Sequence, residues 1–398
     1  MTYFDTLECR SADEREASQL EALQTQIRHA RAVEGACQLR GPDLSTLSDL
    51  AQYPVLRKSD LSKWQAENPP FGGFGVKKPA HIFQSPGPIY EPGGVSHDWW
   101  RMGRFLHACG IGEDDIVQNC FGYHLTPAGM IFENGARAVG ASVLPAGTGQ
   151  TELQVRAAKD IGTTAYAGTP DYLKVILDHA DSSGTELKIT KAAVGGGALF
   201  PSLRQEYADR GIACLQCYAT ADLGNIAYET SAMDGMIIDE GVIVEIVTPG
   251  TGIPVPPGEV GEVVVTTLNP DYPLIRFATG DLSAVLPGQS ACGRTNMRIK
   301  GWMGRADQTT KIKGMFVRPE QVADFVAQNG QVQKARVIAR REGEMDMMTV
   351  QVEASEANTE TLEASVVQLL KLKGKIEFVA PGGLPNDGKV IDDQRTYD

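Results

Sequence analysis

Short apolar runs alternate with segments of helical periodicity between residues 96 and 220. The apolar runs are DIVQNCFGY, ASVLPAG, TTAYAG, KAAVGGG and ACLQCYAT, and each follows a stretch long enough for a helix. We expect those helices at residues 96–110, 126–140, 151–161, 170–180 and 201–209. Strands that alternate with helices of this length indicate parallel βαβ units, whose ligands bind at the carboxyl ends of the strands. The alternation therefore predicts an α/β fold with a site along that edge.

The segments on either side of this region carry different patterns. An amphipathic helix is expected at residues 13–33, and a shorter helix around 43–52. Strands separated by Pro/Gly turns indicate antiparallel hairpins in a β-rich subdomain at about 225–306. The last part of the chain mixes short strands and helices, which is typical of a small α+β domain. We therefore predict a large N-terminal domain at residues 1–306 and a small C-terminal domain at 307–398.

Composition excludes several classes of function. The 398 residues suffice for two or three domains with a substantial core. The formal net charge is -13, and Lys and Arg do not cluster, which argues against a nucleic-acid or anionic-membrane partner. No apolar run approaches the length that spans a bilayer, and the polar first residues lack a signal-peptide core. Seven cysteines at irregular spacings fit a reducing compartment, so we expect a cytoplasmic protein.

The stretch PLIRFATGDL combines a β-like run with acidic and basic residues. Asp281 follows Thr-Gly at the end of the run, Arg276 lies inside it, and Arg305 follows further along the chain. A carboxylate in this setting can accept a pair of hydrogen bonds from a sugar diol, and a guanidinium can hold a phosphate or ribose oxygen. The alternative is a surface turn with one salt bridge. The residues of this stretch alone leave both interpretations open.

Several motifs follow one another along the chain in a characteristic order. They are FGYHLTPAG, VGGGALFP, CYATADLG, PLIRFATGDL, GRADQTTKIKG and LPNDGKV. In this order the chain resembles the phenylacetate–CoA ligase branch of the adenylate-forming enzymes over essentially its full length. The resemblance implies an enzyme that uses ATP, Mg²⁺ and CoA and releases AMP. It also implies a mobile small domain that rotates about a hinge at Asp307, and a homodimer, which is common among such relatives.

The resemblance assigns particular residues to the nucleotide. In the family the glycine turn packs against adenine, the tyrosine stacks on it, and an acidic residue helps to coordinate Mg²⁺. A lysine in the last motif neutralises charge that develops at the carboxylate and the α-phosphate. By position these roles fall on Lys389 and Asp222 for catalysis and on Gly195, Gly196, Gly197, Tyr218, Thr220, Asp281 and Arg305 for nucleotide binding. Ala221 stands where the family has a phosphate-binding threonine, and Thr220 lies beside it.

These nucleotide assignments have plainer alternatives. A glycine triplet such as Gly195–Gly197 is often only a turn between a strand and a helix. Without the resemblance, Lys389 reads as an ordinary surface lysine.

The acid-binding half of the resemblance points to an aromatic slot. Gly168 ends a predicted strand and leaves room for a ligand, and Phe121, Tyr123 and His124 supply rings near another strand end. The alternatives are that Phe121 and Tyr123 are ordinary core aromatics and that His124 is a structural imidazole. An aromatic or arylacetic acid is the substrate that the resemblance implies.

The phosphate loop departs from the family pattern. The aligned stretch FQSPGPIYEPGG has three prolines, which remove amide donors, and only Ser85 keeps a hydroxyl. Gly87 lies within this loop, and Glu91 falls near the expected lysine. A carboxylate about 4 Å from a phosphate charge costs roughly 1 kcal/mol in water and about 4 kcal/mol at an effective dielectric near 20. We therefore expect weak cradling of a triphosphate unless Mg²⁺ or another basic side chain compensates.

A structural zinc site of the family is also incomplete. The family carries Cys-x-Cys before Gly-Arg-Thr, whereas here Ser290 replaces the first cysteine and only Cys292 is kept. One thiolate does not hold a tetrahedral zinc ion. Cys214 and Cys217 lie on a predicted strand, where they point to opposite faces. We predict no zinc.

Two functions are therefore in competition. The first is an acyl-CoA synthetase that activates a carboxylic acid as an acyl-AMP and transfers the acyl group to CoA. The second is a degenerate homologue that has lost ATP activation and binds AMP or acyl-CoA as a sensor or accessory subunit. Ala221 and Glu91 favour the second function, and Lys389, Asp281 and the hinge motif favour the first.

Overall fold

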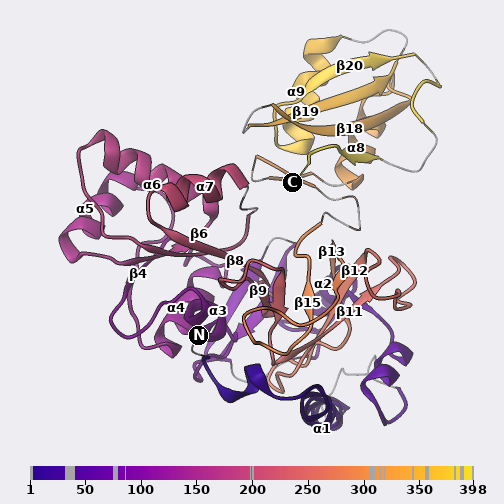
Figure 1. Cartoon of the computed structure of the whole chain (residues 1–398). Coiled ribbons are helices and arrows are strands. Elements are labelled where there is room, and N and C mark those ends of the chain that lie inside the picture. Colours follow the sequence, from indigo (N-terminus) through magenta and orange to yellow (C-terminus); the bar gives the residue numbers. More distant parts are fainter. Residues whose placement is uncertain are drawn as a thin grey trace. The chain divides into compact units, whose positions relative to one another are not determined.

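The computed structural model describes the chain except for residues 1–2, 32–40, 75–78, 86, 198, 200, 304–305, 307, 309, 314, 318, 343–344, 355–357, 381, 386–389 and 397–398. The chain forms two compact units (Figure 1). Unit 1 comprises Met1–Thr279 and Ser283–Trp302, and unit 2 comprises Gly280–Leu282 and Met303–Asp398. Within the part of the chain that is described, no helix is both long and apolar enough to cross a lipid bilayer.

The larger sheet of unit 1 has nine strands in the order β14-β15-β10-β9-β8-β7-β6-β4-β5. The strands from β5 to β8 run parallel, and those from β9 to β14 continue the sheet in antiparallel fashion. Their bounds are β4 (Ile116–Asn119), β5 (Ser142–Pro145), β6 (Ala165–Gly168), β7 (Lys191–Val194), β8 (Ala213–Thr220), β9 (Gly224–Tyr228), β10 (Met236–Ile238), β14 (Val285–Leu286) and β15 (Arg298–Ile299). The predicted α/β fold class is confirmed, and several strands after residue 225 extend the large sheet.

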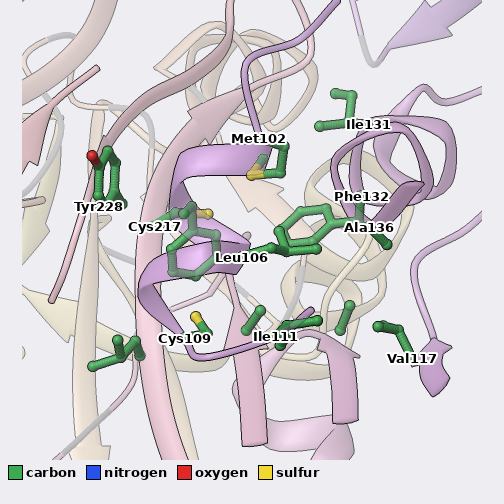
Figure 2. Close-up of a cluster of buried hydrophobic side chains, with 14 of the residues drawn as sticks. Met102, Leu106, Cys109, Ile111, Val117, Ile131, Phe132, Ala136, Cys217 and Tyr228 are labelled. Carbon is green, nitrogen blue, oxygen red and sulfur yellow. The ribbon is translucent and has the colours of Figure 1, made fainter. Parts of the chain in front are cut away.

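Helices cover both faces of the parallel strands (Figure 1). They are α3 (Gly103–Ala108), α4 (Ala128–Ala138), α5 (Thr151–Ile161), α6 (Pro170–Ser182) and α7 (Pro201–Asp209). Ala165 and Ala167 of β6 pack with α3 and α4, whereas Tyr166 between them packs with α5, α6 and α7. Successive side chains of a strand point to opposite faces, so each face of the sheet has its own core. Figure 2 shows Leu106 and Phe132 next to one another in the core on the α3–α4 side.

Helix α3 is shorter than the sequence predicts. We expected a helix over residues 96–110, but the helical residues are only Gly103–Ala108. Asp98 and Arg101 have φ angles of 49° and 62°, which place them in the left-handed region. L-residues adopt this conformation singly and not inside a right-handed helix. The chain therefore turns twice before α3 begins.

The second sheet of unit 1 has the order β1-β13-β12-β11. Its strands are β1 (Leu56–Arg57), β11 (Val242–Val247), β12 (Gly261–Thr267) and β13 (Phe277–Ser283), and the β11–β12 pair is antiparallel as predicted. Near it lie η1 (Thr6–Cys9), α1 (Ala12–Arg31), η3 (Leu47–Gln52), α2 (Lys58–Glu67) and the hairpin of β2 (His81–Ser85) and β3 (Ile89–Gly93). The predicted amphipathic helix is α1, whose Leu23, Ile27 and Ala30 are buried at helical spacing. Helix α2 was not predicted.

Unit 2 is a small α+β body. Its main sheet has the order β20-β19-β18-β21, and two helices complete its core. The elements are β16 (Thr310–Ile312), β17 (Met315–Val317), α8 (Pro319–Gln328), β18 (Lys334–Glu342), β19 (Met345–Glu353), α9 (Thr359–Leu370), β20 (Lys375–Val379) and β21 (Ile391–Asp393). Strand β21 pairs in parallel with β18, although the sequence suggested only a polar tail there.

Candidate active site

The predicted site lies at the carboxyl ends of parallel strands, where the fold brings distant segments together. Gly168 of β6 is paired with Val194 of β7, and Val194 is paired with Gln216 of β8. Beyond these pairs, the amide of Gly195 donates to the carbonyl of Gly168 at 3.1 Å. The glycine segment and Gly168 are therefore neighbours at one edge of the sheet, as the alternation of strands and helices predicts.

Glycine is required at two of these positions by close contacts. A Cβ atom at Gly168 would lie 2.1 Å from the hydroxyl oxygen of Tyr166, and one at Gly195 would lie 3.0 Å from the sulfur of Cys217. Gly196 has a φ of +70°, a conformation that side chains disfavour. The strand ends are thus packed closely beneath a turn that presents mainly backbone.

Only part of the predicted aromatic slot lies beside this turn. A Cβ atom at Gly196 would lie 3.7 Å from the ring of Phe121, so Phe121 borders the glycine turn. The Phe121 ring is buried and stacks on Phe132 with 4.2 Å between ring centroids. It is therefore a core aromatic, as one alternative held, and its role toward an acid stays a prediction.

Tyr123 and His124 differ in their surroundings. The Tyr123 hydroxyl accepts a hydrogen bond from Nδ2 of Asn119 at 2.8 Å. Burial, together with the nearby Glu133 carboxylate, raises the pKa of Tyr123. His124 is exposed to solvent. Of these two residues, Tyr123 is the one held in place from the end of β4.

Tyr218 and Thr220, two further predicted nucleotide residues, lie at the end of β8, next to the turn that leads to β9. Tyr218 is 8% exposed and packs in a hydrophobic cluster with Leu61 and Ile89, so its stacking on adenine stays a prediction. The hydroxyl of Thr220 accepts a hydrogen bond from the amide of Leu223 at 3.2 Å and closes the turn. This hydroxyl stabilises the turn that carries the predicted metal ligand, Asp222.

Asp222 is paired with a lysine that the sequence analysis did not assign to the site. Its Oδ2 atom lies 2.9 Å from Nζ of Lys58, the first residue of α2. The Asp222 side chain is fully buried, whereas that of Lys58 is 40% exposed. The signal for Lys58 was the YPVLRKSDL segment, which matched the family without suggesting a role. Lys58 therefore places a basic side chain beside the predicted metal ligand Asp222.

The degenerate phosphate loop forms the β2–β3 hairpin, and Glu91 points into the protein. Glu91 is 1% exposed and accepts a hydrogen bond from the hydroxyl of Ser85, which is also buried. Gly87 lies in the turn of this hairpin. Burial, and then the charge of Asp222, raise the pKa of Glu91 to about 8. Glu91 is therefore mainly protonated at pH 7, and the expected repulsion of phosphate by a Glu91 carboxylate does not apply.

The ribose and hinge residues fall in different places. Asp281 lies in β13, is 8% exposed and belongs to unit 2. Arg276 binds protein groups: its guanidinium contacts Glu245 at 2.9 Å and donates to the carbonyls of Tyr53 and Gly252, each at 2.6 Å. Arg276 is thus a structural residue and not a ribose ligand. The predicted residues Arg305, Asp307 and Lys389 lie outside the described residues.

The comparisons with known proteins decide the family. No family model matches the chain. A phenylacetate–coenzyme A ligase of Aromatoleum evansii is 32% identical over 381 residues, which cover 89% of this chain and 85% of the relative. The corresponding ligase of Escherichia coli (strain K12) is 30% identical over 90% of this chain and 86% of its own length. The chain belongs to the phenylacetate–CoA ligase family.

Solved structures agree with this family at the level of the fold. A 2-hydroxyisobutyryl-CoA ligase in complex with 2-HIB-AMP and CoA matches with a TM-score of 0.77. The two proteins are 23% identical, and the match covers 98% of this chain and 92% of that structure. This member of the phenylacetate–CoA ligase family therefore has the adenylate-forming fold, as the sequence motifs indicated.

A hydrogen-bonded network surrounds Cys292, the cysteine that is kept in the predicted remnant of a zinc site. The Ser290 hydroxyl donates to Asp234 at 2.9 Å and lies 3.1 Å from the sulfur of Cys292. Hydrogen bonds from Ser290, Arg294 and Thr230 lower the pKa of Cys292 against the effect of its burial. Across the described residues, no group of three or more His, Cys, Asp or Glu side chains is arranged to hold a metal ion.

Chelation is therefore expected to leave the folded protein unchanged. Incubation with excess EDTA should shift the thermal midpoint by less than about 1 °C, because the single thiolate of Cys292 does not hold a structural zinc ion. Differential scanning calorimetry with and without EDTA measures the shift, and metal analysis of the purified protein serves as the control. A drop of several degrees that added zinc restores would contradict the prediction.

Proposed function

We propose that this protein is an AMP-forming carboxylate–CoA ligase that activates an aromatic or arylacetic acid. The observation that carries the proposal is the match to phenylacetate–CoA ligases at 30–32% identity over about nine-tenths of the chain. The glycine turn at the carboxyl ends of β6 and β7 supports it, because this edge is where the fold class binds nucleotides. The small-molecule partners are the acid, ATP and CoA.

The proposed reaction has two half-reactions. In the first, a carboxylate oxygen of the acid attacks the α-phosphorus of ATP, an acyl-AMP forms, and pyrophosphate leaves. In the second, the CoA sulfur attacks the acyl carbon, the thiol loses its proton, and AMP leaves. The glycine turn and Tyr218 would hold adenine, Asp281 and Arg305 the ribose, and Lys389 the charge that develops at the carboxylate and α-phosphate. Rotation of the small domain about Asp307 would switch the enzyme from the first half-reaction to the second.

The residues around Asp222 fit a hard divalent cation. Among the described residues, Oδ1 of Asp222 and Oε2 of Glu91 are buried without a hydrogen-bond partner, whereas Oδ2 of Asp222 is paired with Lys58. Carboxylate oxygens are the ligands that Mg²⁺ prefers, usually together with water and phosphate oxygens. Asp222 would hold the ion, and bound Mg²⁺ supplies charge neutralisation at the phosphates. Lys58 keeps a second positive charge beside the same carboxylate.

Acid-dependent exchange of pyrophosphate into ATP tests the proposal. The wild-type protein should catalyse exchange with at least one member of a panel of aromatic and arylacetic acids. Lys389→Ala should slow exchange by about 100-fold or more, because it removes a charge that acts in the transition state. Lys375→Ala, which changes an exposed lysine of the same unit, is the matched control and should exchange at the wild-type rate. A folded wild-type protein without acid-dependent exchange would overturn the proposal.

The alternative function, a sensor without ATP activation, is not favoured by the comparisons. It rested on Ala221 and on a charged Glu91 in the phosphate loop, and the buried Glu91 no longer supports it. Calorimetric titration with AMP and with ATP–Mg²⁺ separates the two functions. The ligase should bind ATP–Mg²⁺ at least as tightly as AMP, whereas a sensor would gain nothing from the outer phosphates.

We also propose a cytoplasmic homodimer. A reducing location is supported by the irregularly spaced cysteines, of which the six that the structure describes are free thiols. The dimer rests on the resemblance to relatives. Sedimentation equilibrium at micromolar concentration checks it.

A further inference from the structure

The glycine turn is tied to the sheet by a buried carboxylate to which no role has been assigned. Glu229 directly follows Tyr228, the last residue of β9, and is 8% exposed. We propose that Glu229 is a positioning residue for the nucleotide: it orients the Gln216 side chain, which in turn holds Leu199 after the glycine turn of Gly195–Gly197. The inference rests on the proposed function, because it assigns the nucleotide to this segment.

Glu229 determines which way the Gln216 amide faces. The backbone amide and the Nε2 atom of Gln216 both donate to the Glu229 carboxylate, each at 2.9 Å. With Nε2 held by the carboxylate, Oε1 of Gln216 faces the other way and accepts from the amide of Leu199 at 3.4 Å. An unconstrained amide could rotate by 180° and turn its NH2 group toward the backbone N–H of Leu199, which is also a donor, so that the hydrogen bond would be lost. The carboxylate removes that second orientation.

The same carboxylate also anchors the helix that follows the glycine turn. Arg204 of α7 donates to both oxygens of Glu229, at 2.8 and 2.9 Å, and to the carbonyl of Cys214 at 3.0 Å. Charge-assisted bonds of this kind are stronger and more directional than neutral ones. Glu229 therefore secures the start of α7 directly and the preceding segment through Gln216.

These contacts hold the nucleotide segment at both ends. At its beginning, Val194 of β7 is in register with Gln216. At its end, Arg204 fixes α7 to Glu229. Because binding to a flexible loop costs conformational entropy, a loop held at both ends binds its ligand with less loss of free energy. Loss of the Gln216 contact should therefore weaken nucleotide binding more than it weakens the fold.

The test measures AMP affinity and Michaelis constants in two variants. Gln216→Met keeps the length of the side chain but removes the amide, and Glu229→Gln removes the charge that holds Arg204. Each should raise the AMP dissociation constant and the KM for ATP by about tenfold, the loss expected for one hydrogen bond. The KM for the acid should change by less than about twofold. A purely structural role would lower the thermal midpoint and leave the ratio of the two KM values unchanged.

Glu206→Gln is the matched control: Glu206 lies on the same helix as Arg204, and the change weakens its 2.8 Å ion pair with Lys174 of α6 without touching the glycine segment. It should bind AMP as the wild type does. If both Gln216→Met and Glu229→Gln bind AMP within twofold of wild type, the inference is overturned while the proposed function stands. If the wild-type protein itself binds no AMP, the proposed function fails and the inference falls with it.

Discussion

Arg276→Ala is expected to lower the free energy of unfolding by about 3–5 kcal/mol, the cost of removing one partner from a buried ion pair. Arg276 is 2% exposed. Its guanidinium contacts Glu245 through Nε and Nη2, and it donates to the carbonyls of Ala51, Tyr53 and Gly252. Alanine would leave the Glu245 carboxylate and these carbonyl oxygens without this donor.

Urea unfolding followed by circular dichroism measures the loss. Lys174→Ala is the matched control, because Lys174 forms ion pairs in which every partner is about a third or more exposed. Exposed pairs contribute roughly 0.2–1 kcal/mol, so the control should remain near wild type. An Arg276→Ala protein of normal stability with weakened AMP binding would return Arg276 to the ribose role and refute its structural assignment.

Glu91→Gln is expected to stabilise the protein above neutral pH. Burial and the charge of Asp222 raise the pKa of Glu91 to about 8, from an ordinary value of 4.5. Between about pH 4.5 and pH 8, Glu91 therefore keeps its proton in the folded state but has lost it in the unfolded state. Stability from this group is fully present below pH 4.5 and is lost as pH rises to about 8. Glutamine carries no charge at any of these pH values, so the Glu91→Gln protein does not lose stability in this way as the pH rises.

The expected gain at pH 8 is at most about 5 kcal/mol, since the two pKa values lie about 3.5 units apart and each unit contributes roughly 1.4 kcal/mol. The amide oxygen of glutamine can still accept the hydrogen bond from Ser85, so the hairpin should keep its shape. Denaturant unfolding at pH 5, 6, 7 and 8 gives the two stability curves. The curves should diverge with rising pH, and Glu259→Gln, at an exposed glutamate, should follow wild type. Parallel curves for Glu91→Gln would show that Glu91 is already ionised at neutral pH.

The local pattern of the chain predicted most of the parallel sheet. The helices at 151–161 and 201–209 have the predicted bounds, because their amphipathic periodicity lies between clear turn residues. The same alternation placed the glycine turn and Gly168 at one strand edge, since parallel strands end on the same side. Predictions of this kind depend only on residues near one another in sequence.

The partners of charged side chains were decided by the tertiary structure. The sequence shows that Glu91, Asp222 and Arg276 exist, but not that Glu91 is buried, that Asp222 meets Lys58, or that Arg276 meets Glu245. Each pair joins segments that are distant in the chain, and the pKa and the role of each group depend on burial and on neighbouring charge. The chain alone therefore determined its family and the sheet edge at which Gly168 and the glycine turn meet. Only the packing of the strands and helices decided that the glutamate in the phosphate loop is a buried acid and not a charge facing the nucleotide.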